Sequence, residues 1–94
     1  MALRFVWDPR KALANQRWHG VDFTEVETAF DDLLSITIPD PHHSTEELRF
    51  LLLGLSSRGR LLVVAHTERG DAIRLISARR ANRRERRTYE EEER

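Results

Sequence analysis

Apolar residues in the first third of the chain change from a strand-like run to a helical spacing. Residues 3–7 are rich in aromatic and branched side chains, which is typical of a short strand. Asp8 and Pro9 then predict the start of a helix, because Asp can cap free amides and Pro fits the first helical position. Gly20 is a suitable C-terminal stop for this helix, which we expect to end near His19.

A second helix is predicted almost at once. Thr24 and Glu27 form a capping-box pattern, in which each side chain satisfies a free backbone amide. The apolar residues after Thr24 recur at intervals of three and four, which places them on one face of a helix. This apolar stripe consists of Val26, Ala29, Phe30 and Leu33.

The central part of the chain has the pattern of a sheet. Residues 35–38 alternate in polarity, and residues 48–55, 61–66 and 72–77 are nearly continuous apolar runs. Short links that contain Gly separate these three runs, and such links favour antiparallel pairing. We therefore predict a small antiparallel sheet.

An Arg-rich helix is predicted at the end of the chain, over residues 78–89. Its apolar residues are only Ala78, Ala81 and Tyr89, so burial anchors it weakly, and we expect it to fray from about residue 89. Together, the predicted elements form a single α+β domain spanning residues 1–94, in the order β-α-α-β-β-β-β-α.

The zero net charge of the chain conceals three blocks of charge. Residues 1–57 carry five basic and nine acidic residues, residues 58–87 carry ten and three, and residues 88–94 carry one and four. The net charges of the blocks are therefore −4, +7 and −3. All ten basic residues of the middle block are Arg, whose planar fork meets phosphate or carboxylate with two hydrogen bonds. This block suits a phosphate backbone, and docking of an acidic protein segment is the alternative.

The residue types also disfavour several classes of function. The chain has no Cys, which excludes disulfides and thiol catalysis and favours a cytoplasmic location. No apolar run is long enough to span a membrane, and the N-terminal residues do not form a signal peptide. The four His residues show no metal-ligand spacing and no Gly-rich phosphate loop occurs, so we expect neither a metal nor a cofactor.

The candidate catalytic residues lie on and just after the last strands. Cutting RNA without a metal needs a base, an acid and cations that stabilise the charged phosphate. His66 and Glu68 are two residues apart on one predicted strand, so they share a face and either could move a proton. Arg79 and Arg80, just past the next strand, could hold the phosphate. The alternatives are a packing role for His66 and a turn position for Glu68.

Two stretches of the sequence resemble the signatures of the BrnT toxin family. The first consists of Phe5-Val6-Trp7-Asp8-Pro9-Arg10-Lys11, then Asn15, then His19-Gly20-Val21-Asp22-Phe23. The second consists of His66-Thr67-Glu68-Arg69-Gly70 and Ile73-Arg74-Leu75-Ile76-Ser77-Ala78-Arg79-Arg80-Ala81, followed by Glu85-Arg86 and Tyr89. They cover nearly the whole chain, and their joint occurrence at the right spacing makes the resemblance specific.

The resemblance implies a RelE-like fold and the function of a bacterial type II toxin. Such a toxin is a ribonuclease that cleaves RNA and inhibits translation. A BrnA-type antitoxin with a ribbon-helix-helix DNA-binding part would hold it inactive, and the pair would repress its own operon, with operator DNA bound through the antitoxin. The alternative is a non-catalytic module that binds nucleic acid or docks on an antitoxin, because the sequence shows no strong acid–base constellation.

Site residues are carried over from the family one position at a time. The residues at matching motif positions are Lys11, His19, Arg74, Arg79 and Arg80. Arg79 and Arg80 are the first candidates for phosphate binding. The candidate RNA-binding residues are Lys11, His19, Arg58, Arg74 and Arg83. Trp18 stands where the family pattern leads us to expect a basic residue.

Overall fold

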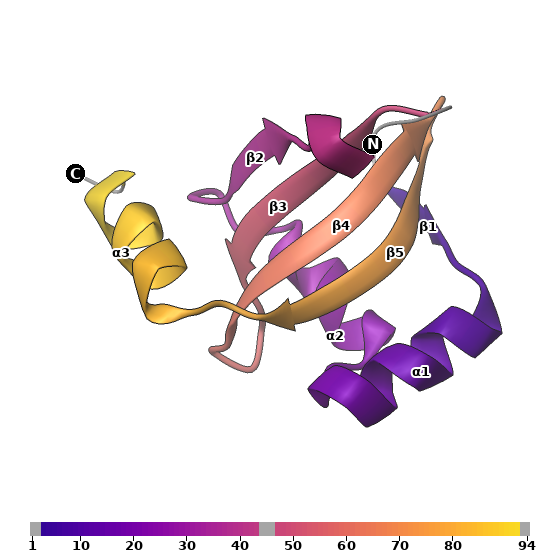
Figure 1. Cartoon of the computed structure of the whole chain (residues 1–94), viewed down its shortest axis with the longest axis horizontal. Coiled ribbons are helices and arrows are strands. Elements are labelled where there is room, and N and C mark those ends of the chain that lie inside the picture. Colours follow the sequence, from indigo (N-terminus) through magenta and orange to yellow (C-terminus); the bar gives the residue numbers. More distant parts are fainter. Residues whose placement is uncertain (1–2, 44–46, 93–94) are drawn as a thin grey trace.

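The computed structural model describes residues 3–43 and 47–92, which form five strands, three α-helices and one 3-10 turn (Figure 1). Along the chain these elements are β1 (Arg4–Val6), α1 (Pro9–His19), α2 (Phe23–Ala29), β2 (Ile36–Pro39), the turn η1 (Pro41–His43), β3 (Arg49–Leu55), β4 (Leu61–Arg69), β5 (Ala72–Arg80) and α3 (Arg83–Glu92). The predicted α+β class is confirmed. Glu93 and Arg94 of the acidic C-terminal block lie outside the described residues. None of the described helices is long and apolar enough to cross a membrane.

The five strands form one mixed sheet in the order β1-β5-β4-β3-β2. The pairs β2–β3, β3–β4 and β4–β5 are antiparallel, and the short links predicted this direction for the last two pairs. Strand β1 instead pairs parallel with β5, with Phe5 opposite Ile73. The prediction of an antiparallel sheet is therefore wrong at this edge. The two strands are far apart in the sequence, so no short turn sets the direction of their pairing.

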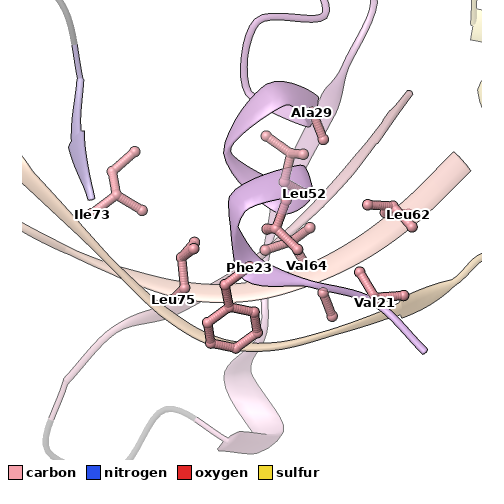
Figure 2. Packing of buried hydrophobic residues seen from close by; sticks show 10 residues of the cluster. Val21, Phe23, Ala29, Leu52, Leu62, Val64, Ile73 and Leu75 are labelled. Carbon is pink, nitrogen blue, oxygen red and sulfur yellow. The ribbon is translucent and has the colours of Figure 1, made fainter. Parts of the chain in front are cut away.

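The core lies between the sheet and α2, while α1 packs against β5 (Figure 1). Figure 2 shows the buried side chains gathered around α2, and burying one of the size of Phe23 contributes about 1.5–3 kcal/mol. On β4 they alternate with residues of the opposite face, as the pleat requires. The buried cluster comprises Val21, Phe23, Val26, Ala29, Leu52, Leu62, Val64, Ile73, Leu75 and Ala78.

Helix α2 starts earlier and ends earlier than its sequence pattern predicted. Asp22 is its N-cap, and the Asp22 carboxylate accepts a hydrogen bond from the Thr24 N–H at 2.9 Å. Because the helix ends at Ala29, Leu33 leaves the apolar stripe and is 99% exposed. The end of α2 also approaches β3 closely, since a Cβ at Gly54 would lie 2.7 Å from the Ala29 carbonyl oxygen.

Asn15 joins α1 to the open edge of β5. Strand β1 pairs with β5 only as far as Arg74, so the next part of this edge has no strand beside it among the described residues. The Asn15 Oδ1 accepts a hydrogen bond from the Ala78 N–H at 2.9 Å, and its Nδ2 donates to the Val21 carbonyl at 3.0 Å. The Asn15 side chain is buried, so it supplies partners where water does not compete.

We expect Asn15→Ala to lower the free energy of unfolding by about 2–3 kcal/mol, because two buried backbone groups lose their partner. Denaturant unfolding followed by circular dichroism measures this loss. Gln16→Ala is the matched control, since Gln16 is exposed on the same helix and its replacement should change stability by less than about 0.5 kcal/mol. Equal stability of the two variants would contradict this role for Asn15.

The last helix begins later than predicted. Strand β5 continues to Arg80, so Arg79 and Arg80 are strand residues and only the residues from Arg83 onwards are helical. The cause is a capping box between Asn82 and Glu85, which was not predicted from the sequence. The Asn82 N–H donates to Glu85 Oε1 and the Glu85 N–H donates to Asn82 Oδ1, both at 2.8 Å.

Helix α3 lies at the side of the sheet, beyond the end of β5 (Figure 1). Its Tyr89 is buried, and the Tyr89 hydroxyl donates to Asp32 Oδ2 at 2.6 Å. Asp32 Oδ2 also accepts a hydrogen bond from the Leu55 N–H at 2.8 Å. One aromatic side chain thus ties this weakly apolar helix to β3.

Candidate functional site

Arg79 and Arg80, the predicted phosphate ligands, point to opposite faces of the sheet. They are consecutive on β5, where Arg79 lies opposite Val63 and Arg80 lies opposite Leu62. Cross-strand partners share a face, and Leu62 belongs to the core on the side of the helices α1 and α2. Arg80 therefore emerges on the side of these helices, and Arg79 emerges on the other side.

Arg79 is held in a two-pronged ion pair with Glu85 of α3. Its Nη1 and Nη2 atoms each lie 2.8 Å from a Glu85 carboxylate oxygen, and the side chain is 44% exposed. The hydrogen bonds that Arg79 donates to the Glu85 carboxylate raise the pKa of Arg79 above its ordinary range. The guanidinium is thus neutralised within the chain and joins β5 to α3.

His66 is closed off from solvent. It is 1% exposed on β4, with its ring edge-on to Phe30 at 5.0 Å and stacked with Phe50 at 5.9 Å between ring centroids. Burial lowers the pKa of His66 below 6.5, and the Val64 carbonyl and the Glu68 carboxylate oppose this only in part. In this conformation His66 is a neutral packing residue with no access to an RNA hydroxyl.

The other candidates on the sheet and the last helix lie apart from one another. Glu68 is an exposed residue of β4, so the alternative of a turn position for it is wrong. Arg74 on β5 lies 3.6 Å from Glu47 Oε1, on the face opposite the core. Arg58 lies in the turn between β3 and β4, and Arg83 is the first residue of α3.

Lys11 and His19 are the two candidates that the structure brings together. They lie about two turns apart along one side of α1. With Ile76 and Ser77 of β5 they line a groove of about 210 Å³, which we call the α1 groove. The full lining is Lys11, Ala14, Asn15, Trp18, His19, Ile76 and Ser77.

An irregularity in β5 forms the strand wall of the α1 groove. Ala65 pairs with Ser77 but the next residue, His66, pairs with Leu75, so Ile76 is an extra residue without a partner on β4. Bulges re-aim side chains, and here Ile76 lines the groove beside α1. Nothing in the sequence signalled this bulge, because Ile76 fits the apolar run of a regular strand.

Lys11 places a positive charge in the lining of the α1 groove, and further cations lie on the same helix. Helix α1 contains Arg10, Lys11 and Arg17 and no acidic residue. Arg80 does not line the groove, but it lies on the same face of β5 as Ala78, two positions or about 7 Å further along the strand, and Ala78 is bonded to Asn15 of α1. Cations beside an imidazole suit a phosphate group. Among the described residues no three His, Asp or Glu side chains gather as a metal site.

A buried carboxylate that was not predicted from the sequence lies in the first turn of α2. The Glu25 side chain is 3% exposed and accepts hydrogen bonds from the Ser56 hydroxyl at 2.7 Å and from Arg60 Nε at 2.9 Å. Arg60 Nη2 donates to the second oxygen of Glu25 and to the Gly20 carbonyl. These contacts fasten the β3–β4 hairpin to α2 and to Gly20 at the end of α1.

Known proteins match the sequence and the fold of this chain. The family described as "Ribonuclease toxin, BrnT, of type II toxin-antitoxin system" matches residues 7–85. Among solved structures, the crystal structure of the Brucella abortus ribonuclease toxin BrnT has a TM-score of 0.69 and 24% sequence identity, covering 86% of this chain and 99% of that chain. At this identity the likeness concerns the fold. A search of curated proteins finds no match.

Proposed function

Because the chain belongs to the BrnT family of ribonuclease toxins of type II toxin–antitoxin systems, we propose that it is a RelE-like endoribonuclease of the cytoplasm. It cleaves RNA without a metal ion and thereby inhibits translation. The observation that carries the proposal is the family match over residues 7–85, which includes every residue that lines the α1 groove.

The α1 groove is the proposed place of the chemistry. The His19 imidazole accepts the proton of a ribose 2′-hydroxyl, whose oxygen attacks the adjacent phosphorus. The bond from phosphorus to the 5′ oxygen breaks, that oxygen takes a proton from water, and a 2′,3′-cyclic phosphate remains. Lys11 and Arg80 stabilise the extra negative charge on the phosphate. His19 is exposed and lines the groove, which is why we assign it proton transfer.

The other predicted catalytic residues receive different roles in this proposal. His66 packs the core between Phe30 and Phe50, which is the alternative that its sequence position left open. Glu68 is an exposed residue of β4 that does not line the α1 groove, and it receives no role in the chemistry proposed there. Arg79 positions α3 through Glu85 instead of binding the phosphate.

Replacing the two adjacent arginines separates these roles. Arg80→Ala should lower kcat/KM for RNA cleavage about 10- to 100-fold, because a charged hydrogen bond to the phosphate is lost. Arg79→Ala should lower the thermal stability of α3 and leave kcat/KM much less affected. Arg86→Ala is the control, since it removes an exposed Arg of α3. Full activity of Arg80→Ala would show that Arg80 does not contact the phosphate.

Expression of the chain alone in a bacterium tests the proposed function. We expect growth arrest and new messenger RNA ends after induction, with both effects lost in the His19→Ala variant. Soluble protein that produces neither effect would contradict the proposal. Purified protein that binds RNA with a steep salt dependence yet leaves it intact would favour the non-catalytic binding module instead.

The antitoxin partner of a type II toxin is proposed to be of the BrnA type, with a ribbon-helix-helix part through which the pair represses its operon. An apolar groove of about 190 Å³ between the sheet and α3 supports binding of a partner chain. Its lining is Ile36, Ile38, Leu51, Leu53, Val63, Glu85 and Thr88. The neighbouring reading frame should encode a short ribbon-helix-helix protein that copurifies with this chain, and a neighbour of another kind would contradict the pairing.

A further inference from the structure

We propose that the Trp18 indole is a stacking platform for one nucleobase of single-stranded RNA bound in the α1 groove. This inference rests on the proposed ribonuclease function and identifies how the same groove holds its substrate. Trp18 lines the groove and is 83% exposed, so its ring does not contribute to the packing of the core. The other tryptophan, Trp7, packs edge-on against Phe23 with 5.8 Å between the ring centroids, so it contributes to the packing of the protein.

Helical spacing leaves open space between Trp18 and Lys11. The two residues are seven positions apart, about 10 Å along one side of α1. Ala14 lies between them, three positions after Lys11 and four before Trp18, and its methyl group leaves that stretch hollow. A nucleotide can therefore place its base on the indole and its phosphate toward Lys11.

The neighbours of Trp18 favour RNA over a protein partner. Arg17 and His19 flank it in the sequence, Lys11 shares its groove, and α1 contains no acidic residue. An aromatic ring among cations is the pattern of sites for single-stranded nucleic acid. The centre of a protein interface is instead depleted of charge, and the exposed Leu33, the half-exposed Leu34 and the apolar groove beside α3 belong to other parts of the surface.

The strand wall of the groove supports the same substrate. Ser77 is exposed and offers a hydroxyl that can donate to or accept from a ribose or phosphate. Ile76, aimed into the groove by the bulge, offers an apolar contact to the edge of a stacked base. The groove thus presents an indole, an ammonium, an imidazole and a hydroxyl within one small volume, which together match a nucleotide unit.

Binding of a short 2′-O-methyl oligoribonucleotide, which cannot be cleaved by 2′-hydroxyl attack, tests the platform. Trp18 fluorescence in a Trp7→Phe background should be quenched by this oligonucleotide and not by an abasic phosphodiester oligomer of equal length and charge. Trp18→Ala should weaken binding of the base-containing probe about 5- to 100-fold, as expected for loss of one stacked base. Trp18→Phe should retain most of the affinity.

Controls separate stacking from other effects. Leu13→Ala removes a half-exposed apolar side chain from another side of α1 and should bind both probes as the wild type does. If Trp7→Phe does not fold, the affinity for the base-containing probe is divided by the affinity for the abasic probe. This ratio is then compared between the wild type and Trp18→Ala. Equal loss of affinity for both probes, or no loss for either, would overturn the platform. Cleavage of RNA without base-dependent Trp18 binding would overturn the platform alone, whereas base-dependent binding without any cleavage would overturn the proposed function alone.

Discussion

His19→Ala is expected to lower the rate of RNA cleavage about a hundred- to ten-thousand-fold, the usual contribution of a general base. The imidazole of His19 is exposed in the α1 groove and makes no contact on which the core depends. The variant should therefore fold with unchanged stability and still bind RNA, because Lys11 and Arg80 remain. Single-turnover cleavage of an end-labelled RNA at saturating enzyme measures the chemical step separately from binding.

His42→Ala is the matched control for this prediction. His42 is an exposed histidine in η1, away from the α1 groove, and its replacement should leave the rate unchanged. A His19→Ala variant that cleaves RNA at the wild-type rate would remove His19 from the mechanism. Restoration of cleavage by added imidazole would support proton transfer at this position, because it returns the missing base without restoring any side-chain packing.

Glu25→Gln is expected to lower the free energy of unfolding by about 3 kcal/mol near neutral pH, the low end for breaking a buried ion pair. The Glu25 carboxylate is almost fully buried, while its partner Arg60 keeps some contact with solvent. An amide at this position accepts fewer hydrogen bonds and leaves the Arg60 charge without its counter-ion. Because Ser56 and Arg60 lie at the β3–β4 hairpin, the loss should appear first as weaker amide protection there.

The effect of Glu25 should depend on pH. Hydrogen bonds from Arg60, assisted by Ser56, hold the pKa of Glu25 below its ordinary value of 4.5, against the opposing effect of burial. A carboxyl with a lowered pKa contributes stability above its unfolded-state pKa and loses it as pH falls through the folded-state value. The stability gap between wild type and Glu25→Gln should therefore be constant at neutral pH and narrow below about pH 4.5.

Urea unfolding of both proteins across this pH range measures the gap. Glu27→Gln is the matched control, since it removes one carboxylate from the same helix without touching the Glu25 cluster. It should change stability by less than about 0.5 kcal/mol at neutral pH. A gap that does not narrow in acid would show that the ionised form of Glu25 is not what fastens the hairpin to α2.

Local signals in the sequence were sufficient for most of the fold. Asp8, Pro9 and Gly20 set the limits of α1, and the apolar runs set β3, β4 and β5. The parallel placement of β1 was not predicted, because long-range pairing leaves no local pattern. The spacing of Asn82 and Glu85 is that of a capping box and indicates the start of α3, whereas the Arg pattern before it wrongly predicts an earlier start.

The family and the candidate site differed in how well they could be predicted. The BrnT resemblance is confirmed, since it rests on motifs that extend along most of the chain. The residues of the site stay predictions, and the structure separates those expected to act together. The alternation of side chains along β4 places His66 on the face of the sheet that carries the core. Its burial, however, depends on the packing of Phe30 and Phe50, which the strand pattern does not show. The α1 groove depends on a bulge at Ile76 and on the exposed ring of Trp18, which a strand pattern and a helix pattern do not show.

Cleavage of a pair of matched oligonucleotides tests whether the ribose 2′-hydroxyl attacks the phosphorus without the help of a metal ion. One is an RNA that the toxin cuts, and the other carries a single 2′-deoxy nucleotide on the 5′ side of the cut. With a chelator present, we expect the RNA to be cut to a product that ends in a 2′,3′-cyclic phosphate and the deoxy version to remain intact at that position. Cleavage of the deoxy version, or a need for added divalent metal ions, would contradict attack by the 2′-hydroxyl in the α1 groove.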